Sequence, residues 1–429
     1  MAKLLIKNTA IYQDQQVLEG KSILIENDNI KGIVNADSEE EREFAAEEVI
    51  QANGMLASPG LVNTHTHIAM TLFRSYADDM KLMDWLEKKI WPIEAKLDRE
   101  EVYWATQLGI AEMLRGGTTA FADMYFFMEE TAKAVKESGI RAALSRGLAG
   151  VSPNGEQALA ENVQFFRDWH NQADGRITVQ LGPHAPYTCP VPYLHKVAEK
   201  AKEIGAQIHM HLSETREEVA NCQKEHGKTP IALMNEIGIF DTGCIAAHCV
   251  HVTEEDMDIM AEKKVRVAHN PQSNLKLASG IAPVPAMLKK GIVIGLGTDG
   301  ASSNNNLDMI EEMRLAVTLH KANTYDPLAV PAAAAIDMAS TEGAKVLGYT
   351  NIGEIKPGFK ADITLWNREG LHWQPRHDMV SLMAYSAAAS DADTVIVNGK
   401  VLMKNRELLT IDEERVKAEI EQCKEKLFQ

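Results

Sequence analysis

Two histidines separated by one residue end the first long apolar segment of the chain, in the stretch GLVNTHTHIAM. Side chains alternate between the two faces of an extended strand, so His65 and His67 should point the same way. Leu61 and Asn63 belong to the same face in this prediction. Two imidazoles directed into one space favour a metal site. A pair of polar residues at the end of a strand is the alternative, and these residues alone do not decide between the two.

A second pair of histidines lies in the stretch AQIHMHLSE, where His209 and His211 share a face and Glu214 follows. His211 ends the predicted strand, where a ligand to a shared metal would lie. His209 lies one layer deeper. A hydrogen-bonded histidine inside the fold is therefore the favoured interpretation of His209, whereas His211 is a candidate ligand.

The stretch GIVIGLGTDGASS places a carboxylate at the end of another apolar segment. Val293, Gly295 and Gly297 precede Asp299 on one face, which is nearly free of bulky side chains and would leave room in an interior. The opposite face is bulky and would pack against outer helices. Asp299 would complete a ligand set with His211 and the first pair of histidines. Three histidines and one aspartate leave a coordination position for water, as catalytic zinc requires.

These stretches belong to a long region, residues 58–354, in which short apolar strands alternate with amphipathic helical segments. This alternation is typical of βα units and a parallel sheet. Eight such units closing on themselves form a TIM-type (β/α)8 barrel, whose site lies at the C-terminal ends of the strands. The eight predicted strands are Leu61–His67, Thr119–Met124, Arg141–Arg146, Ile177–His184, Gln207–Leu212, Ile245–His251, Arg266–His269 and Ile292–Asp299.

Both ends of the chain have β character. Residues 3–36 resemble short strands joined by turns, and ADITLW and DTVIVNGKVLMKN follow residue 350, with Asn398-Gly399 as a hairpin signal. The last segment, EERVKAEIEQCKEKL, predicts an amphipathic helix. We therefore predict an α/β protein with two domains. Residues 1–57 and 355–429 form a composite β-sandwich, and residues 58–354 form the metal-dependent catalytic barrel.

Composition excludes several classes of partner. The chain has 429 residues and a net charge of −17, which argues against nucleic acid and anionic membranes as partners and leaves a small molecule as the expected one. No apolar run reaches the ~18 residues of a membrane span, and the first residues lack the apolar region of a signal peptide. The five cysteines contain no C-x-x-C, which favours a reducing cytoplasm. Assembly into a homo-oligomer is compatible with this composition.

The motifs PGLVNTHTH, HLSET, AHCVH, HNPQSNLKLASG and GLGTDGASSNNN stand in the order typical of the amidohydrolase superfamily. Over essentially its whole length the chain resembles the 5-methylthioadenosine/S-adenosylhomocysteine deaminases of that superfamily. GEIKPGFKADITLW resembles the return from barrel to sandwich. The resemblance implies that His65, His67, His211 and Asp299 are metal ligands and that Glu214, His248 and Asp299 are catalytic.

Some members of the superfamily hold two metals bridged by a modified lysine. The candidate strands RAALSRG and ITVQLGPH contain no lysine, so we expect one metal per chain. Zinc is favoured, although iron(II) accepts similar ligands. In the implied reaction an activated water attacks C6 of adenine while Glu214 protonates ring N1. Asp299 accepts the proton of the water, His248 orients that water, and ammonia leaves.

The resemblance also implies contacts with a nucleoside substrate. Glu94 would hold the ribose hydroxyls, His184 would contact the purine, and Arg146 would reach the carboxylate of S-adenosylhomocysteine. Glu214 and Asp299 would touch the reacting ring. A second arginine, present in some relatives, is not evident in GLAGVSPNGEQALAEN, so methylthioadenosine is the better supported substrate.

Two alternatives stay open at this point. A related hydrolase could act on a guanine, cytosine or halogenated triazine ring, although Glu94 and Arg146 favour a nucleoside with a tail. A non-enzymatic relative could use the barrel as a binding module. The complete ligand set together with Glu214 argues against that second alternative.

Overall fold

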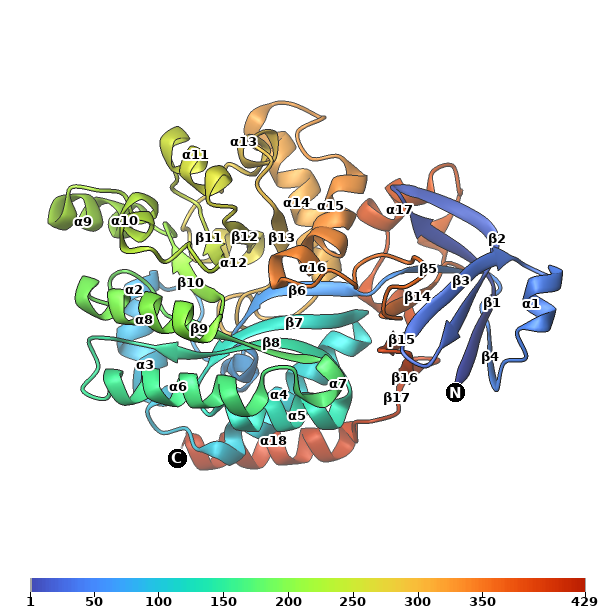
Figure 1. Cartoon of the computed structure of the whole chain (residues 1–429), viewed down its shortest axis with the longest axis horizontal. Coiled ribbons are helices and arrows are strands. Elements are labelled where there is room, and N and C mark those ends of the chain that lie inside the picture. Colours follow the sequence, from blue (N-terminus) through green and yellow to red (C-terminus); the bar gives the residue numbers. More distant parts are fainter. Residues whose placement is uncertain (1, 429) are drawn as a thin grey trace.

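The alternating strands and helices close into a parallel barrel, as predicted (Figure 1). The computed structural model describes residues 2–428. Each strand of the eight-stranded sheet is parallel to the next, in the order of the sequence. The strands are β6 Leu61–Thr66, β7 Thr118–Tyr125, β8 Arg141–Leu148, β9 Ile177–Pro183, β10 Ile208–Leu212, β11 Cys244–His248, β12 Arg266–His269 and β13 Ile294–Leu296.

The first and last strands of the barrel, β6 and β13, meet through a short set of hydrogen bonds. The Asp299 backbone N–H donates to the carbonyl oxygen of His65 at 2.9 Å. The Thr64 hydroxyl donates to the carbonyl of Leu296 at 2.8 Å. A side chain thus supplies part of the contact between β6 and β13, which we call the seam. The seam joins His65 on β6 to Asp299 after β13, and both are predicted metal ligands.

The predicted alternation along residues 61–67 is only partly correct. Leu61 packs in the large cluster shared with the outer helices, whereas Val62 packs with alanines of the barrel interior. The pairing of β6 with β7 shifts between Asn63 and Thr66, so strict two-residue alternation does not hold through this segment. The placement of Leu61 on the histidine face was therefore wrong. His65 and His67 still converge on one side, with ring centroids 4.9 Å apart.

Helices surround the barrel and close its ends. The helix α16 contributes Val346 and Leu347 to the same cluster as the interior alanines, so it plugs the end at which the strands begin. The segments η1, α2, η2 and α3 follow β6 and lie near the opposite end (Figure 1). The helices of the barrel region are η1 Ile68–Phe73, α2 Leu82–Trp85, η2 Leu86–Ile90, α3 Trp91–Glu94, α4 Arg99–Arg115, α5 Met128–Ser138, α6 Gly155–Trp169, α7 Gln172–Gly175, α8 Val191–Ile204, α9 Arg216–His226, α10 Pro230–Ile237, α11 Glu254–Glu262, α12 Pro271–Lys276, α13 Val284–Lys289, α14 Met309–Thr324, α15 Ala332–Met338 and α16 Thr341–Leu347.

The two chain ends combine in a second, nine-stranded mixed sheet, which confirms the composite β unit. Strand β5 pairs with β1 from the N-terminal part and with β14 from the C-terminal part. The predicted hairpin at Asn398-Gly399 joins β15 to β16. The elements are β1 Lys3–Gln13, β2 Gln16–Glu26, β3 Asn29–Asn35, α1 Glu39–Glu43, β4 Glu48–Gln51, β5 Met55–Pro59, β14 Ile363–Asn367, η3 Leu371–Trp373, α17 Met379–Tyr385, η4 Ala389–Asp391, β15 Ala392–Val397, β16 Lys400–Lys404, β17 Glu407–Leu408 and α18 Glu413–Leu427.

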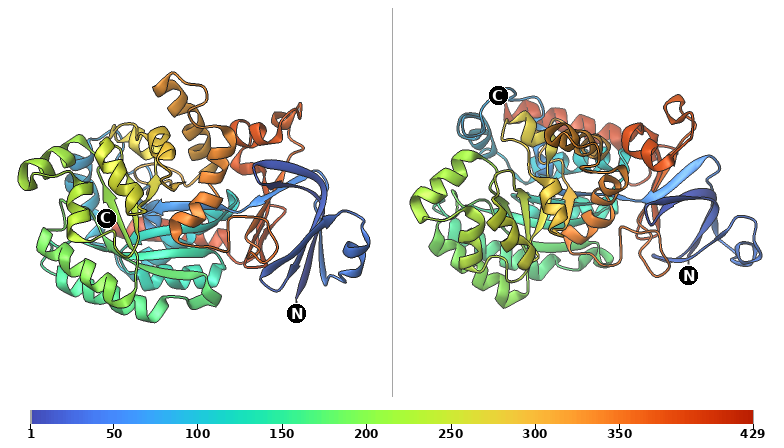
Figure 2. Two further views of the ribbon diagram at one scale, coloured as in Figure 1. Left: turned by 45° about the horizontal axis from the view of Figure 1, so that its top comes forward. Right: turned by 90° about the horizontal axis from the view of Figure 1, so that it is seen from above.

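The second sheet lies beside the barrel in all views (Figure 2). It contacts the end at which the barrel strands begin, because Arg141, the first residue of β8, pairs with Asp362 before β14. Helix α18 leaves this sheet and runs along α4 of the barrel, where Val416, Cys423 and Leu427 are buried. The division into residues 1–57 with 355–429 and residues 58–354 stays a prediction. Strand β5 of the second sheet extends to Pro59, past the predicted boundary, and α18 packs on the barrel.

Two further expectations concern the whole chain. None of the helices within residues 2–428 has the length and apolar character needed to cross a bilayer. All five cysteines are free and buried.

Candidate metal centre and active site

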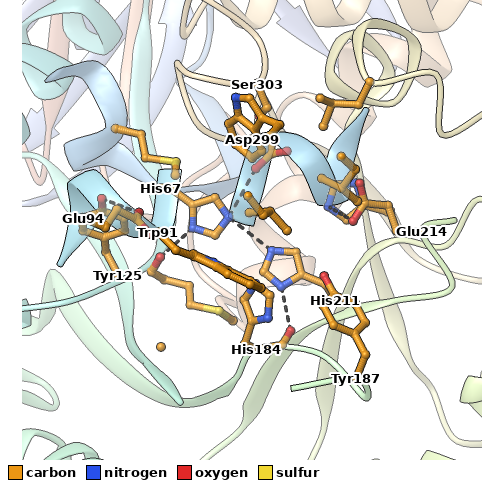
Figure 3. Close-up of a pocket in the computed structure, with 18 of the residues that line it drawn as sticks. His67, Trp91, Glu94, Tyr125, His184, Tyr187, His211, Glu214, Asp299 and Ser303 are labelled. Atoms are coloured by element: carbon orange, nitrogen blue, oxygen red, sulfur yellow. Dashed lines mark hydrogen bonds and ion pairs between the residues drawn. The ribbon is translucent and has the colours of Figure 1, made fainter. Parts of the chain in front are cut away.

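The four predicted metal ligands come together at the C-terminal ends of the barrel strands. Figure 3 labels His67, His211 and Asp299, which line the pocket there. His65 lies on β6 and His67 directly after it, His211 lies on β10, and Asp299 follows β13. The Nε2 atoms of His67 and His211 are 3.2 Å apart. The Asp299 Oδ1 atom lies 3.4 Å from His65 Nε2 and 3.3 Å from His67 Nε2. Residues up to 234 positions apart in the sequence therefore meet at one point.

The hydrogen bonds of these histidines show which nitrogen is free for a metal. His67 Nδ1 donates to the carbonyl of Met124 and His211 Nδ1 donates to the carbonyl of His184, each at 2.7 Å. Because a carbonyl only accepts, both Nδ1 atoms carry the proton in the neutral ring. Their Nε2 lone pairs then face each other and a carboxylate, an arrangement that a cation between them satisfies. The residues therefore fit a metal ion.

His65 extends the same pattern into the interior. Its Nδ1 atom lies 2.8 Å from Nε2 of His209, which confirms the prediction that His209 is a buried, hydrogen-bonded histidine. Its Nε2 atom is buried and has no hydrogen-bond partner among the described residues. Burial lowers the pKa of His65 to about 4, so the ring stays neutral at physiological pH. Partners of this kind fix the ring orientation of metal ligands.

Asp299 is held through both of its carboxylate oxygens. Oδ1 accepts the Gly300 backbone N–H at 2.8 Å, and Oδ2 accepts the Ser273 hydroxyl at 2.7 Å. Burial by itself would raise the pKa of Asp299, but the close polar contact with His65 at 3.4 Å, together with the charge interaction with His67, lowers that pKa well below its usual range. The group is therefore an ionised carboxylate at the point where the imidazoles converge.

Glu214 and His248 lie beside this cluster, at the ends of β10 and β11. Glu214 Oε2 is 3.9 Å from His248 Nε2, and Glu214 Oε1 accepts the Ser279 hydroxyl at 3.3 Å. His248 Nδ1 lies 2.8 Å from the side-chain oxygen of Asn274. Burial raises the pKa of the Glu214 carboxyl, so this group keeps its proton to a higher pH than an exposed glutamate. Burial lowers the pKa of His248, but nearby Glu214 and Asp299 raise it, and the net direction is upward.

The backbone is in the left-handed region at three residues of the site. The φ angle is 53° at Ser213, 74° at His248 and 62° at Asp299. This region is unfavourable for residues other than glycine and occurs preferentially at functional sites, where the surrounding structure maintains it. Of these three residues, His248 and Asp299 line the pocket, and Ser213 lies directly before Glu214, which lines it too.

Glu94 and His184 line the same pocket as the metal cluster. Glu94 ends α3 and accepts the Tyr125 hydroxyl at 2.7 Å, while burial raises the pKa of Glu94 to about 7. His184 follows β9, its Nδ1 atom lies 2.9 Å from the Thr188 hydroxyl, and burial lowers its pKa to about 3. A neutral imidazole and a carboxyl group therefore face the space above the metal cluster from two different sides.

Arg146 lies in an adjoining cavity of about 620 Å³ rather than in the metal pocket itself. The two spaces share Trp91, Glu94 and Phe126 as walls. Arg146 Nη2 forms an ion pair with Glu161 Oε2 at 2.8 Å. Arg146, the predicted carboxylate-binding residue, thus faces the charged cavity that adjoins the metal pocket, and Glu161 already pairs with Arg146.

Several contacting residues had no assigned role in the sequence. Ser273, Asn274 and Ser279 lie in the motif HNPQSNLKLASG, so the motif marked their position but not the partner of each. Tyr125 ends β7 and carries no motif that could have linked it to Glu94, which is 31 positions away in the sequence. Glu218 follows the motif HLSET and contacts the backbone beneath Glu214.

Comparisons with known proteins identify the family of this chain. The profile of the Amidohydrolase family matches residues 56–402. A curated protein of Dictyoglomus turgidum, named 5-methylthioadenosine/S-adenosylhomocysteine deaminase, is 55% identical over 98% of this chain and 97% of its own. The crystal structure of an adenosine deaminase from Xanthomonas campestris with bound zinc has a TM-score of 0.95 at 34% identity, covering 99% of this chain and 98% of that chain. A triazine hydrolase, at 24% identity and a TM-score of 0.91, shares the fold.

The chain belongs to the amidohydrolase family. It is therefore a hydrolytic enzyme built on the (β/α)8 barrel, and its relatives of about half-identical sequence are named deaminases.

Proposed function

We propose that the protein deaminates the adenine ring of 5′-methylthioadenosine and S-adenosylhomocysteine, giving the hypoxanthine product and ammonia. The observation that carries this proposal is a single pocket lined by metal ligands, by Glu214 and by Glu94. Such a pocket combines the groups that hydrolysis of a ring amine requires with a carboxyl group suited to a ribose. The names of the curated relatives support the same substrates.

The cluster fits one zinc ion per chain, held by His65, His67, His211 and Asp299. Three nitrogen ligands and one oxygen ligand with an open position suit catalytic zinc, and iron(II) accepts a similar set. When bound, the ion supplies Lewis-acid activation of a water molecule at neutral pH. No lysine is among the described residues that line the pocket, which supports a single ion over a lysine-bridged pair.

Glu214, His248 and Asp299 would move or position the protons. Glu214 would donate its proton to ring N1 while water adds to C6, because the neutral ring resists attack until N1 is protonated. Asp299 would accept the proton that the water loses, with His248 orienting that water. Asp299 would then pass that proton to the amino group, the C6–N bond breaks and ammonia leaves, while the C6 hydroxyl proton returns to Glu214 as the C6 carbonyl forms. One water molecule is consumed, and a C–O bond replaces the C–N bond.

The remaining residues would bind the nucleoside. Glu94 would accept hydrogen bonds from both ribose hydroxyls, and His184 would contact the purine. Arg146 and the charged cavity around it would receive a substituent at the 5′ position. The volume of that cavity supports a substrate that extends beyond the ribose, as both proposed nucleosides do.

A side-by-side assay of ammonia release tests the proposal. The substrates are 5′-methylthioadenosine, S-adenosylhomocysteine, adenosine, guanine, cytosine and a chlorinated triazine. We expect the two 5′-thio nucleosides to give the highest kcat/KM. Fastest release from guanine or cytosine, or fastest chloride release from the triazine, would instead establish a related hydrolase. Absence of ammonia release from every one of these substrates in zinc-loaded and iron-loaded protein would refute the proposed deaminase activity.

We also propose a cytoplasmic location and a small-molecule substrate as the main partner. The five buried, free cysteines are compatible with a reducing compartment. A homo-oligomer is compatible with the fold, and the sedimentation coefficient of the purified protein tests it.

A further inference from the structure

Glu218 makes an unusual pair of hydrogen bonds beneath the turn that carries Glu214. Its Oε1 atom accepts the backbone N–H of Ser213 and its Oε2 atom accepts the backbone N–H of Glu214, each at 2.8 Å. All three residues are buried. One carboxylate therefore satisfies two consecutive buried backbone donors at the C-terminal end of β10.

The position of Glu218 in its helix makes this contact informative. Thr215 caps the N-terminus of α9, and Glu218 is the third residue of that helix. A glutamate at this position usually accepts the backbone N–H of the capping residue itself, closing a capping box. Glu101 does so at the third position of α4, where its carboxylate accepts the Asp98 N–H at 2.6 Å. Glu218 instead reaches past Thr215 to the two preceding residues.

The turn that Glu218 holds is strained and lies next to the reacting groups. Ser213 has a φ of 53°, which a residue with a side chain keeps only when its surroundings maintain it. The carbonyl of Ser213 accepts the N–H of His251 at 2.9 Å, so the peptide is held from both sides. Without Glu218, the two buried N–H groups would lack their acceptors, and the turn would relax toward an ordinary conformation.

We propose that Glu218 is a positioning residue that holds the Glu214 carboxyl group in line with the substrate ring. This inference rests on the proposed role of Glu214 as the general acid. The hydrogen bonds of Glu218 within the described residues go to Ser213, Glu214 and Thr215, none of them a predicted metal ligand, and Glu218 does not line the pocket. It acts through the backbone of the turn that carries Glu214. Displacement of a reacting group by about 1 Å can cost on the order of 10²-fold in rate, so a shift of this turn should lower turnover.

The test is a double-mutant cycle with Glu218→Ala and Glu214→Gln, assayed with 5′-methylthioadenosine. In the parent protein, Glu218→Ala should lower kcat by about 10- to 10²-fold and leave KM within about threefold, because the nucleoside-binding residues are untouched. In the Glu214→Gln background the same change should cost less than about twofold, since the group being positioned is already gone. Metal content should equal that of the parent. If the alanine variant fails to fold, Glu218→Gln, which preserves the side-chain volume, replaces it in the cycle.

Glu101→Ala is the matched control. It removes a buried glutamate from the third position of a different helix, α4. It should therefore lower the free energy of unfolding and leave kcat unchanged. Equal fold-losses from Glu218→Ala in both backgrounds, or a kcat within about twofold of the parent, would overturn the proposal.

Amide hydrogen exchange separates this inference from the proposed function. The amides of Ser213 and Glu214 should exchange faster in Glu218→Ala than in the parent, whatever the substrate of the enzyme. Retained protection would overturn the positioning role even in an active deaminase. If Glu214→Gln alone leaves turnover unchanged, then the assignment of the general acid fails, and the positioning of Glu214 for catalysis fails with it.

Discussion

At the scale of single residues, each imidazole of the cluster uses one nitrogen for the protein and leaves the other for the metal. His67 and His211 donate from Nδ1 to backbone carbonyls, and His65 contacts His209. These contacts fix the orientation of each ring and leave its Nε2 atom directed at the cluster. Metal affinity should therefore depend on each ligand and, to a smaller extent, on the residue behind it.

The ligand set predicts one metal ion per chain. His211→Ala should remove most of the bound metal and nearly all turnover, because it deletes one of four donors and leaves two facing imidazoles without a third. Elemental analysis of the parent and the variant measures both quantities. His209→Gln is a useful comparison, since it changes the residue behind His65 and should retain more metal than His211→Ala. Two tightly bound ions per chain in the parent would contradict the mononuclear site.

Glu94 should select for the sugar without affecting the chemistry. Its carboxylate can accept both ribose hydroxyls, and hydrogen bonds to charged groups contribute about 1.5–3 kcal/mol each. Glu94→Ala should therefore reduce kcat/KM for 5′-methylthioadenosine by roughly 10²-fold or more, with metal content unchanged. A 2′,3′-dideoxy analogue should be hydrolysed about equally by variant and parent.

The pH dependence gives a second measure of the same contact. Burial raises the pKa of Glu94 to about 7, so the carboxyl gains a proton as the pH falls through that value and loses acceptor capacity. The advantage of the ribose nucleoside over its dideoxy analogue should accordingly shrink below about pH 7. If Glu94→Ala impairs both substrates alike, then Glu94 supports the fold of the pocket rather than the sugar.

At the scale of elements, the seam between β6 and β13 depends on glycines that admit the neighbouring strand. A Cβ atom on Gly297 would overlap Asn270 Oδ1 and lie 2.9 Å from the backbone nitrogen of His65. One on Gly295 would overlap the Thr64 side chain. The nearly empty face predicted for this strand is therefore confirmed, and its cause is the close approach of β6 with its histidine.

Gly297→Ala should separate β13 from β6 and displace His65 and Asp299 together. Overpacking of a tight interior costs about 1–3 kcal/mol, and here the displaced atoms include two metal ligands. We expect lower metal occupancy and a lower unfolding midpoint, measured by elemental analysis and denaturant titration. Gly32→Ala is the control, because its Cβ would meet only the Leu24 side chain at an ordinary 3.7 Å. Full metal occupancy in Gly297→Ala would show that the seam tolerates a methyl group.

At the scale of the whole molecule, a buried ion pair joins the barrel to the second sheet. Arg141 Nε donates to Asp362 Oδ2 at 2.7 Å, and Arg141 Nη2 also lies 3.2 Å from the side-chain oxygen of Asn398. Tyr349 places its ring against the guanidinium, 5.4 Å from centroid to carbon. Residues from β8, from the β15–β16 turn and from the segment before β14 thus meet at the end of the barrel opposite the metal site.

Arg141→Met should destabilise the protein by about 3–5 kcal/mol, because it leaves the Asp362 carboxylate buried without its counter-charge. The double variant Arg141→Met/Asp362→Leu should lose less than Arg141→Met alone, since no unpaired charge remains. Denaturant unfolding measures both, and metal content should stay at the parent value in each. A double variant as unstable as the sum of the two single changes would mean that the pair contributes by packing rather than by charge.

Local patterns in the sequence were enough to predict the eight barrel strands, the composite β unit and the C-terminal helix. Each of these elements has a pattern that depends only on residues close together in the sequence. A short apolar run, a hairpin dipeptide and an apolar stripe with helical spacing are therefore recognisable without knowing the fold. The ligands His65, His67, His211 and Asp299 were predicted because the ends of parallel barrel strands must meet at one edge. The roles of these residues in binding metal remain predictions that the variants above test.

Only the tertiary structure decided which side chains support that site. The bonds of Tyr125 to Glu94 and of Ser273 to Asp299 join residues that no periodic pattern connects. The ion pair between Arg146 and Glu161 likewise depends on how α6 packs against β8. Sequence spacing predicts contacts along one strand or helix. Contacts between elements depend on packing angles and strand register, and those arise only when the whole barrel closes.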